Sequence, residues 1–294
     1  MSKLQRLTAD SKYYHEAFSS FHRVANRKEA FSQWLNTDLR DIVQGLNLNV
    51  SDKDPIRVLS VGPGDGDMES EVLRLFRDNV KHRPERVLTT VLEPAADKAR
   101  LFEERMTMED FSNIELDFKI QTLQDYQNAA ENQTTKFHFI TSAHSIYYVP
   151  DLRAAIKDLY ERLEPDGLMV VLVTSAHHGI TRIRERFPVF DKLQGLLTSS
   201  PDILAACQSQ AIPITAQLQI KIRGDVTACF DQELTDEGRL LLSFLTHAMH
   251  FVRDAPETLR KEVVEFLGTE ACTEKQSDGR MSSICDWDAF IFKR

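Results

Sequence analysis

The sequence predicts an α/β protein built on a doubly wound, mostly parallel sheet. Short apolar segments rich in β-branched residues alternate with segments of helical apolar spacing between residues 56 and 174. A helix between successive strands makes those strands parallel and covers both faces of the sheet. A glycine-rich turn follows the first apolar segment, and ligands bind at the carboxyl ends of the strands in such sheets.

Each expected strand is a short run of apolar or alternating residues. The seven strands are expected at residues 56–61, 87–92, 114–120, 137–141, 168–174, 214–222 and 287–292. Helical spacing predicts helices over residues 68–76, 95–106 and 151–163. Pro165, Asp166 and Gly167 predict a turn just before the fifth strand.

Two further helical regions lie outside this alternation, one ahead of the sheet and one over residues 234–266. We expect a single domain, residues 1–294, in which residues 1–50 form a helical lid and residues 175–270 supply cap elements. Tyr14, Phe18 and Phe21 in the lid have the spacing i, i+4, i+7, which places them on one helical face.

Composition narrows the class of protein. The formal net charge of −9, without a basic cluster, argues against a nucleic-acid partner. No apolar run approaches the roughly 20 residues that span a bilayer, and the N-terminus lacks a secretory signal. The four cysteines form no CxxC pair, so we expect no metal site, no disulfide framework and a cytoplasmic location.

The strongest motif is a strand that runs into Gly62, Gly64 and Gly66. Glycines permit a tight turn and a close approach of a ligand to the backbone. Asp67 follows them and places a carboxylate where a dinucleotide pyrophosphate would bind, so the loop suits a cofactor with a sulfonium and an ammonium group. Glu93 ends the second strand, where an acid accepts hydrogen bonds from the two hydroxyls of a ribose.

These motifs resemble those of class I S-adenosylmethionine-dependent methyltransferases and, more narrowly, the histamine N-methyltransferases. The resemblance covers nearly the whole chain. It includes the glycine loop, the segment from Val91 to Pro94, the Lys-Tyr-Tyr that ends at Tyr14, the Tyr147-Tyr148 pair and the C-terminal segment from Ala289 to Phe292. It implies a seven-stranded sheet with an antiparallel last strand, a helical cap and a monomer. It also implies S-adenosylmethionine as methyl donor, with S-adenosylhomocysteine as product.

The resemblance also implies site residues. The cofactor contacts carry over to Gly62, Gly64, Gly66, Glu93, Thr122 and Ala143. The substrate contacts carry over to Tyr14, Phe18, Phe21, Arg27, His144, Tyr147, Tyr148, Phe187, Phe244 and Asp286. In the family a glutamate, a glutamine and an asparagine hold the amine and imidazole, whereas this chain places Arg27, His144 and Asp286 at those positions. His144 and Asp286 are the candidate catalytic residues.

The sequence leaves several alternatives open. The leading hypothesis is an N-methyltransferase for a small imidazole-containing amine, either histamine-like or carboxylated, such as histidine or a histidine dipeptide. The chain could instead be a non-catalytic binding protein of this fold, or a nicotinamide-dependent dehydrogenase, which the loop spacing and Asp67 disfavour. An alignment slip of two residues would put Glu29 in place of Arg27. His247 and His250 lie three apart on an expected helix and lack a third metal ligand.

Overall fold

The computed structural model describes residues 4–48, 50, 54–81, 85–108, 111, 113–190 and 198–294. The chain divides into two compact units. We call the first the helical unit; it comprises Met1–Phe31, Thr174–Ser199 and Gln219–Trp287. The second, the sheet unit, comprises Ser32–Val173, Ser200–Leu218 and Asp288–Arg294. The predicted lid and cap segments contribute residues to both units, and their role as lid and cap stays a prediction.

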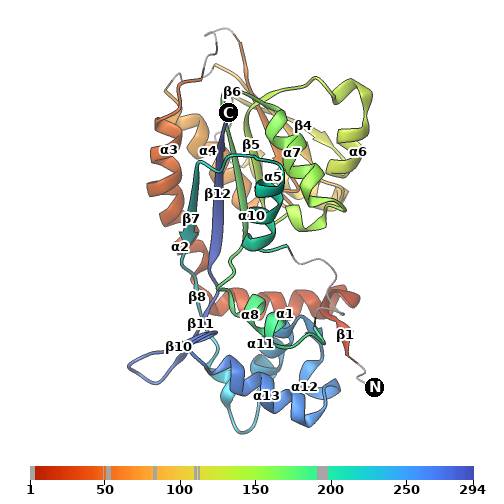
Figure 1. Cartoon of the computed structure of the whole chain (residues 1–294), viewed down its shortest axis with the longest axis vertical. Helices are drawn as coiled ribbons and strands as arrows, with labels where there is room; N and C mark the ends of the chain where they lie inside the picture. The colour runs from red at the N-terminus through yellow and green to blue at the C-terminus, as the bar shows by residue number, and fades with distance from the viewer. Residues whose placement is uncertain are drawn as a thin grey trace. The chain divides into compact units, whose positions relative to one another are not determined.

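All seven predicted strands are present in one sheet (Figure 1). Its strands, in spatial order, are β4 (Ile114–Lys119), β3 (Val87–Leu92), β2 (Ile56–Val61), β5 (Phe137–Ala143), β6 (Leu163–Thr174), β12 (Trp287–Lys293) and β7 (Ala216–Ile220). β2 pairs in parallel with β3 and β5, as do β3 with β4 and β5 with β6. The last strand is antiparallel, so the predicted fold class is confirmed.

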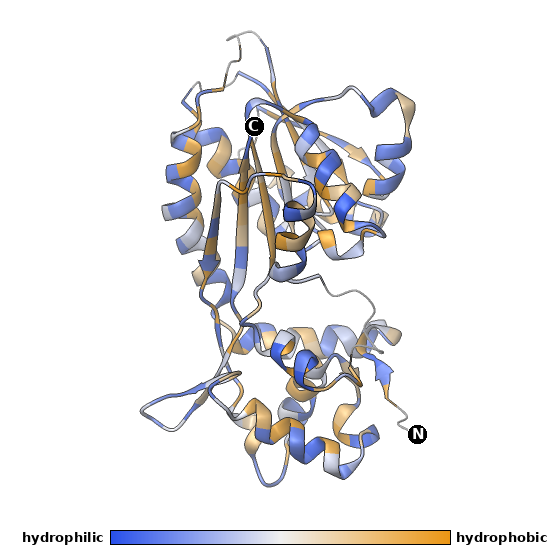
Figure 2. Ribbon diagram, viewed as in Figure 1, coloured by the Kyte–Doolittle hydropathy of each residue, from blue (hydrophilic) through white to orange (hydrophobic). Residues whose placement is uncertain are grey.

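Helices connect the strands as the apolar spacing predicts. The predicted helices are α4 (Asp67–Asn79), α5 (Ala96–Thr107) and α7 (Leu152–Glu161), and further ones are α2 (Arg27–Trp34), α3 (Arg40–Gln44), α6 (Leu123–Asn128) and α10 (Ser200–Ser209). The helices carry alternating hydrophilic and hydrophobic residues (Figure 2). Their apolar faces bury against central strands that are themselves almost wholly buried, as in the stack of Phe76 of α4 on Phe139 of β5.

The predicted turn at residues 165–167 is a bulge inside β6. This strand starts at Leu163, and its pairing with β5 shifts register between Phe137 and Phe139. Asp166 has a positive φ of 64°, and its amide donates to the carbonyl of Arg294. The C-terminal strand therefore supplies a partner that continues the ladder across the bulge.

The helical unit contains α1 (Ser11–Val24), α8 (Gly179–Arg186), α11 (Asp236–Thr246), α12 (Phe251–Asp254) and α13 (Glu257–Leu267). Two small sheets were not predicted. One pairs β1 (Gln5–Arg6) with β9 (Ala248–Met249); the other orders β10 (Thr273–Lys275), β11 (Met281–Ile284) and β8 (Arg223–Asp225). Their strands are two to four residues long, too short for an alternation pattern in the sequence.

The helical region expected over residues 234–266 is present as α11, α12 and α13, but His247 and His250, which were expected on one helix, lie outside all three. His247 and His250 both have positive φ, 51° and 48°, and flank β9. The left-handed His247 ends α11, and its carbonyl accepts from the amide of Leu7. Pairing with the N-terminal segment therefore outweighs the helical spacing. In the part of the chain that the structure describes, no helix is long and apolar enough to cross a bilayer.

Candidate functional site

The glycine loop lies between β2 and α4 in the sheet unit. Gly62, Gly64 and Gly66 all have positive φ, between 60° and 74°. A Cβ on Gly62 would lie 2.6 Å from Cβ of Ser145, and one on Gly66 would lie 2.0 Å from the ring of Phe102. A Cβ on Gly64 would meet open space. Neighbouring side chains therefore require glycine at the two outer positions, and the middle glycine leaves room above the backbone.

Glu93 connects two turns of this site. One carboxylate oxygen accepts from the amide of Gly64 and the other from the amide of Ala95, both at 2.9 Å. The side chain is buried, so these bonds fix its orientation. Each carboxylate oxygen can accept more than one hydrogen bond. Glu93 can therefore hold the loop and still accept from a pair of ligand hydroxyls.

A cavity of about 580 Å³ lies at the carboxyl ends of β2, β3 and β5. Five of the six predicted cofactor residues line it: Gly62, Gly64, Glu93, Thr122 and Ala143. Its volume is in the range usual for small-molecule sites, about 300–1,000 Å³. Asp67, by contrast, forms an ion pair at 3.6 Å with Arg105 of α5. The topology thus brings the predicted cofactor residues together at the expected edge of the sheet.

Thr122 serves as the N-cap of α6. Its hydroxyl donates to the carboxylate of Asp125 at 2.6 Å and accepts from the amide of Asp125 at 3.1 Å. The amide of Thr122 donates to the same carboxylate at 3.3 Å, which completes a capping box, and the bond from the hydroxyl to Asp125 uses its single proton. Thr122 therefore shapes the cavity wall mainly through its backbone position, and its contact with a cofactor stays a prediction.

His144 also lines the cavity and has a left-handed backbone, with φ of 53°. Its amide donates to the carbonyl of Leu172, and its Nδ1 shares a hydrogen bond with the hydroxyl of Tyr147. A left-handed conformation costs a residue with a Cβ about 1–2 kcal/mol, and such strain concentrates at functional sites. Tyr148, also on the cavity wall, is 83% exposed, whereas Tyr147 packs on the apolar core of the sheet unit.

Ser145 is a site residue that sequence reasoning missed. Its hydroxyl donates to the carbonyl of Val61, and its Oγ lies 2.8 Å from Oγ of Ser142. Ser145 therefore joins the loop after β5 to the start of the glycine loop, where its Cβ faces Gly62. A single serine carries no recognisable motif, so only the fold shows this role.

Four predicted substrate residues meet within the helical unit. Ring centroids of Tyr14 and Phe18 are 5.7 Å apart, those of Phe18 and Phe244 6.0 Å, and those of Phe21 and Phe244 4.5 Å. We call these four rings the aromatic row. Phe187, in contrast, packs against Phe190 and Phe266 at 6.2 and 5.8 Å. The described contacts thus place Phe187 in a separate aromatic group.

Arg27 is oriented by a residue that sequence reasoning missed. Its Nη2 lies 3.2 Å from Nδ1 of His22, and the ring centroid of His22 lies 3.7 Å from that of Phe18. Glu29, which a slipped alignment would place at this site, is exposed on α2. The structure therefore connects Arg27, rather than Glu29, to the aromatic row through His22. The spacing of His22 four residues after Phe18 was the only available signal.

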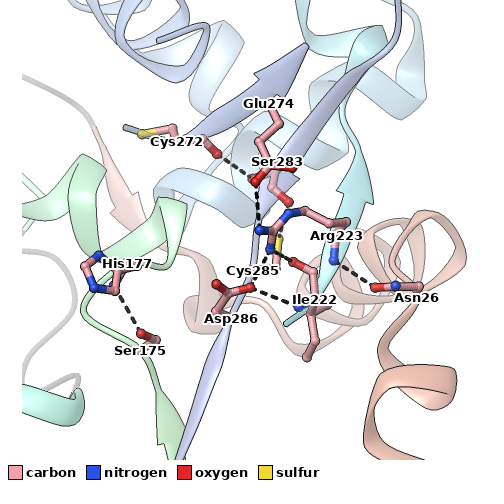
Figure 3. A network of polar contacts seen from close by, with 10 residues as sticks. All are labelled: Asn26, Ser175, His177, Ile222, Arg223, Cys272, Glu274, Ser283, Cys285 and Asp286. Atoms are coloured by element: carbon pink, nitrogen blue, oxygen red, sulfur yellow. Dashed lines mark hydrogen bonds and ion pairs between the residues drawn. The ribbon is translucent and has the colours of Figure 1, made fainter. Parts of the chain in front are cut away.

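Asp286 lies in a network of polar contacts in the helical unit (Figure 3). It is buried, and its Oδ1 accepts from the amide of Ile222 at 2.9 Å and from Nη1 of Arg223. Arg223 also donates to Glu274 at 2.8 Å. These contacts give Asp286 a structural role as the partner of a cation, and its predicted catalytic role stays a prediction.

Two histidines of the helical unit are strongly desolvated. Burial lowers the pKa of His178 to about 3, and the nearby His247 adds to this effect. Burial, with the charge of Arg184, lowers the pKa of His247 to about 4. Both imidazoles are therefore neutral at pH 7. Among the described residues, no group of three or more His, Cys, Asp or Glu side chains could hold a metal ion.

Comparisons with known proteins identify the family of the chain. A family model described as a methyltransferase domain matches residues 31–200. The histamine N-methyltransferases of Danio rerio and Cavia porcellus are 27% and 26% identical to this chain; the first alignment covers 94% of this chain and 93% of the relative, and the second 94% of each. A solved structure of loganic acid methyltransferase with SAH has the same fold, with a TM-score of 0.55 at 9% identity over 90% of this chain and 92% of that one. The predicted resemblance is confirmed, and the chain belongs to the methyltransferase domain family.

Proposed function

We propose that this methyltransferase transfers a methyl group from S-adenosylmethionine to a nitrogen of a small imidazole-containing amine. The observation that carries the proposal is the cavity of about 580 Å³ in which Glu93 lies beside the open backbone of Gly64. Its carboxylate can accept from the two ribose hydroxyls of an adenosine group. The space above Gly64 permits a close approach to the backbone.

Methyl transfer from an activated donor requires the protein mainly to position the acceptor nitrogen. S-adenosylmethionine, when bound, supplies an activated methyl on a positively charged sulfur. The chain must present a neutral nitrogen lone pair in line with it and exclude water. His144, whose ring is held by Tyr147 at the cavity wall, can accept the proton that the methylated nitrogen heterocycle releases. Aromatic faces favour cationic groups, which suits a row of aromatic rings in the acceptor-binding elements.

Calorimetric titration with S-adenosylmethionine and with NAD tests the donor. Glu93→Ala should weaken S-adenosylmethionine by roughly 1.5–3 kcal/mol, the scale of hydrogen bonds to a charged group. Glu115→Ala is the matched control, because Glu115 is a carboxylate on β4 whose partner is the exposed Arg86. Unchanged affinity in Glu93→Ala, or preferential binding of NAD, would overturn the proposal. Tight binding without methylation of any acceptor would favour a non-catalytic binding protein.

The acceptor class is the finer part of the proposal. The link between Arg27 and the aromatic row favours a carboxylated imidazole, because a guanidinium repels an ammonium and binds a carboxylate with two hydrogen bonds. The deciding comparison is kcat/KM for histamine against histidine and histidine dipeptides, in the wild type and in Arg27→Glu. A wild-type preference for histamine over every carboxylated acceptor would overturn this part.

A further inference from the structure

We propose that His22 and Arg27 together form the anchor for a carboxylate on the acceptor, with Arg27 holding His22 as a neutral imidazole that donates from Nε2. The proposal deepens the proposed function and rests on it. It adds a specificity-determining residue, His22. Arg27 then both binds the carboxylate and orients His22. Both residues belong to the helical unit.

His22 continues the aromatic row along α1. Tyr14, Phe18 and His22 are spaced four residues apart, which places them on one face of the helix. The imidazole lies 3.7 Å from the ring of Phe18, tilted by 45°. Phe244 of α11 contacts Phe18 at 6.0 Å. The imidazole is therefore the polar end of a row of rings that can contact a flat acceptor.

The hydrogen bond between Arg27 and His22 determines which tautomer His22 adopts. A guanidinium has five N–H donors and no acceptor, and it stays protonated in proteins. In the contact of 3.2 Å between Nη2 of Arg27 and Nδ1 of His22, Nδ1 must therefore be the acceptor. The proton of the neutral imidazole then lies on Nε2.

Backbone contacts fix the position of Arg27 relative to α1. Ala25 and Asn26 connect the end of α1 to Arg27. Ala25 forms a bridge with Gly224 of β8, and the amide of Asn26 donates to the carbonyl of Arg223 at 3.0 Å. The side chain of Asn26 accepts from the amide of Arg223 at 2.7 Å. The corner between α1 and α2 is thus fixed by a backbone hydrogen bond and by the side chain of Asn26. A fixed corner reduces the entropy that a long side chain loses when it binds a ligand.

These groups define the chemical class of acceptor. A guanidinium beside a neutral N–H donor binds a carboxylate through charge and directed hydrogen bonds. The same pair repels the ammonium group of the decarboxylated amine and offers it no hydrogen-bond acceptor. The rings of Phe18 and Tyr14 suit a planar heteroaromatic group next to that carboxylate. The site therefore fits an imidazole amino acid or dipeptide better than its decarboxylated amine.

The test uses the whole protein and two substitutions at one position. His22→Phe keeps a ring against Phe18 and removes the donor, whereas His22→Gln keeps an amide N–H near the position of Nε2. The ratio of kcat/KM for histidine over that for histamine should fall about tenfold in His22→Phe, as expected for a lost hydrogen bond to a charged group. His22→Gln should recover most of the ratio. His15→Phe, at an exposed position of the same helix, should leave the ratio unchanged.

A binding measurement separates this proposal from the proposed function. Calorimetric titration of histidine into the complex with S-adenosylhomocysteine should show weaker binding in His22→Phe than in the wild type and in His15→Phe. Equal affinity in all three proteins, or an unchanged histidine-to-histamine ratio, would refute the anchor even if the wild type methylates imidazoles. The opposite outcome is also distinguishable. If the wild type methylates no imidazole but its binding of histidine still depends on His22, the proposed function is refuted and the anchor is supported.

Discussion

The two units bring their predicted site residues together in different ways. In the sheet unit, the glycine loop and Glu93 each follow directly after a strand, and parallel pairing of β2 with β3 brings them together. In the helical unit, the aromatic row joins Phe18 and Phe21 of α1 to Phe244 of α11, more than 200 residues later. The first site depends on short segments at strand ends. The second depends on how distant helices pack.

This difference bears on how each site tolerates change. The predicted cofactor site is a set of backbone turns, so substitutions there act through φ and through contacts made by an added Cβ. The proposed acceptor site is a set of rings and polar side chains, so substitutions there act through lost packing and lost hydrogen bonds. Substitutions in the two units should therefore separate into different classes of effect.

The largest effect is expected at Gly66. Gly66→Ala would place a Cβ 2.0 Å from the buried ring of Phe102 at a φ of 74°. Overpacking and left-handed strain together should lower the free energy of unfolding by about 4 kcal/mol. Urea denaturation measures this loss, and calorimetry should show that S-adenosylmethionine binds more weakly.

Gly64→Ala is the matched control for that substitution. It has a similar φ of 63°, but its added Cβ would meet open space. Only the backbone strain remains, about 1–2 kcal/mol. Equal losses of stability in the two variants would show that φ alone, and not the contact with Phe102, makes the loop sensitive.

Much of the sheet unit was predictable because its determinants are local. The bounds of β2 and β3 match the predicted runs residue for residue, since mostly buried strands are rich in apolar and β-branched residues. The glycines and Glu93 are recognisable because their position after a strand limits what they can do. Ser145 was missed, because its contact with Val61 spans 84 residues and leaves no pattern in the sequence.

The next prediction separates packing from acceptor contact on α1. Phe21 is 6% exposed and stacks on Phe244, so Phe21→Ala should cost about 3 kcal/mol of stability. Phe18 is only partly buried, so Phe18→Ala should cost about 1 kcal/mol while lowering kcat/KM for the acceptor about tenfold. Thermal unfolding and steady-state kinetics give the two quantities. An unchanged kcat/KM in Phe18→Ala would show that the ring only packs.

A smaller effect is expected at Asp286. Asp286→Asn keeps an oxygen for the amide of Ile222 but leaves Arg223 without its buried carboxylate partner. Stability should fall by about 2 kcal/mol, below the cost of deleting a buried partner outright. Glu274→Gln removes the exposed partner of the same arginine and should cost at most about 0.5 kcal/mol. If Asp286 is also catalytic, Asp286→Asn should lower kcat at full acceptor saturation, and Glu274→Gln should not.

The helical unit was harder to predict because distant contacts override local preference there. Residues 234–266 have helical spacing, yet pairing of β9 with β1 interrupts them at His247 and His250. Arg27 and Asp286 were predicted as site residues, but their contacts with His22 and Arg223 were not predicted. Sequence spacing indicates which face of a helix a residue occupies, but it does not identify the residue that approaches from another element.

The smallest effect is expected in the pH dependence of the free energy of unfolding, to which His178 of the helical unit contributes. Burial lowers the pKa of His178 to about 3, whereas an unfolded chain protonates the same imidazole near its ordinary value of 6.5. Below pH 6.5 the unfolded state therefore binds a proton that the folded state does not, and stability falls as pH falls towards 3. Between pH 7.5 and 5.5 the loss from this group should be about 1.4 kcal/mol. His247, with its pKa lowered to about 4, acts in the same direction.

Because Nδ1 of His178 caps α8 by accepting from the amide of Ile180 at 3.1 Å, His178→Asn should keep the cap while removing the titration. Urea denaturation at the two pH values should then show a loss smaller by about 1.4 kcal/mol in His178→Asn than in the wild type. Equal losses in both proteins would mean that His178 is hydrated enough to titrate normally in the folded state.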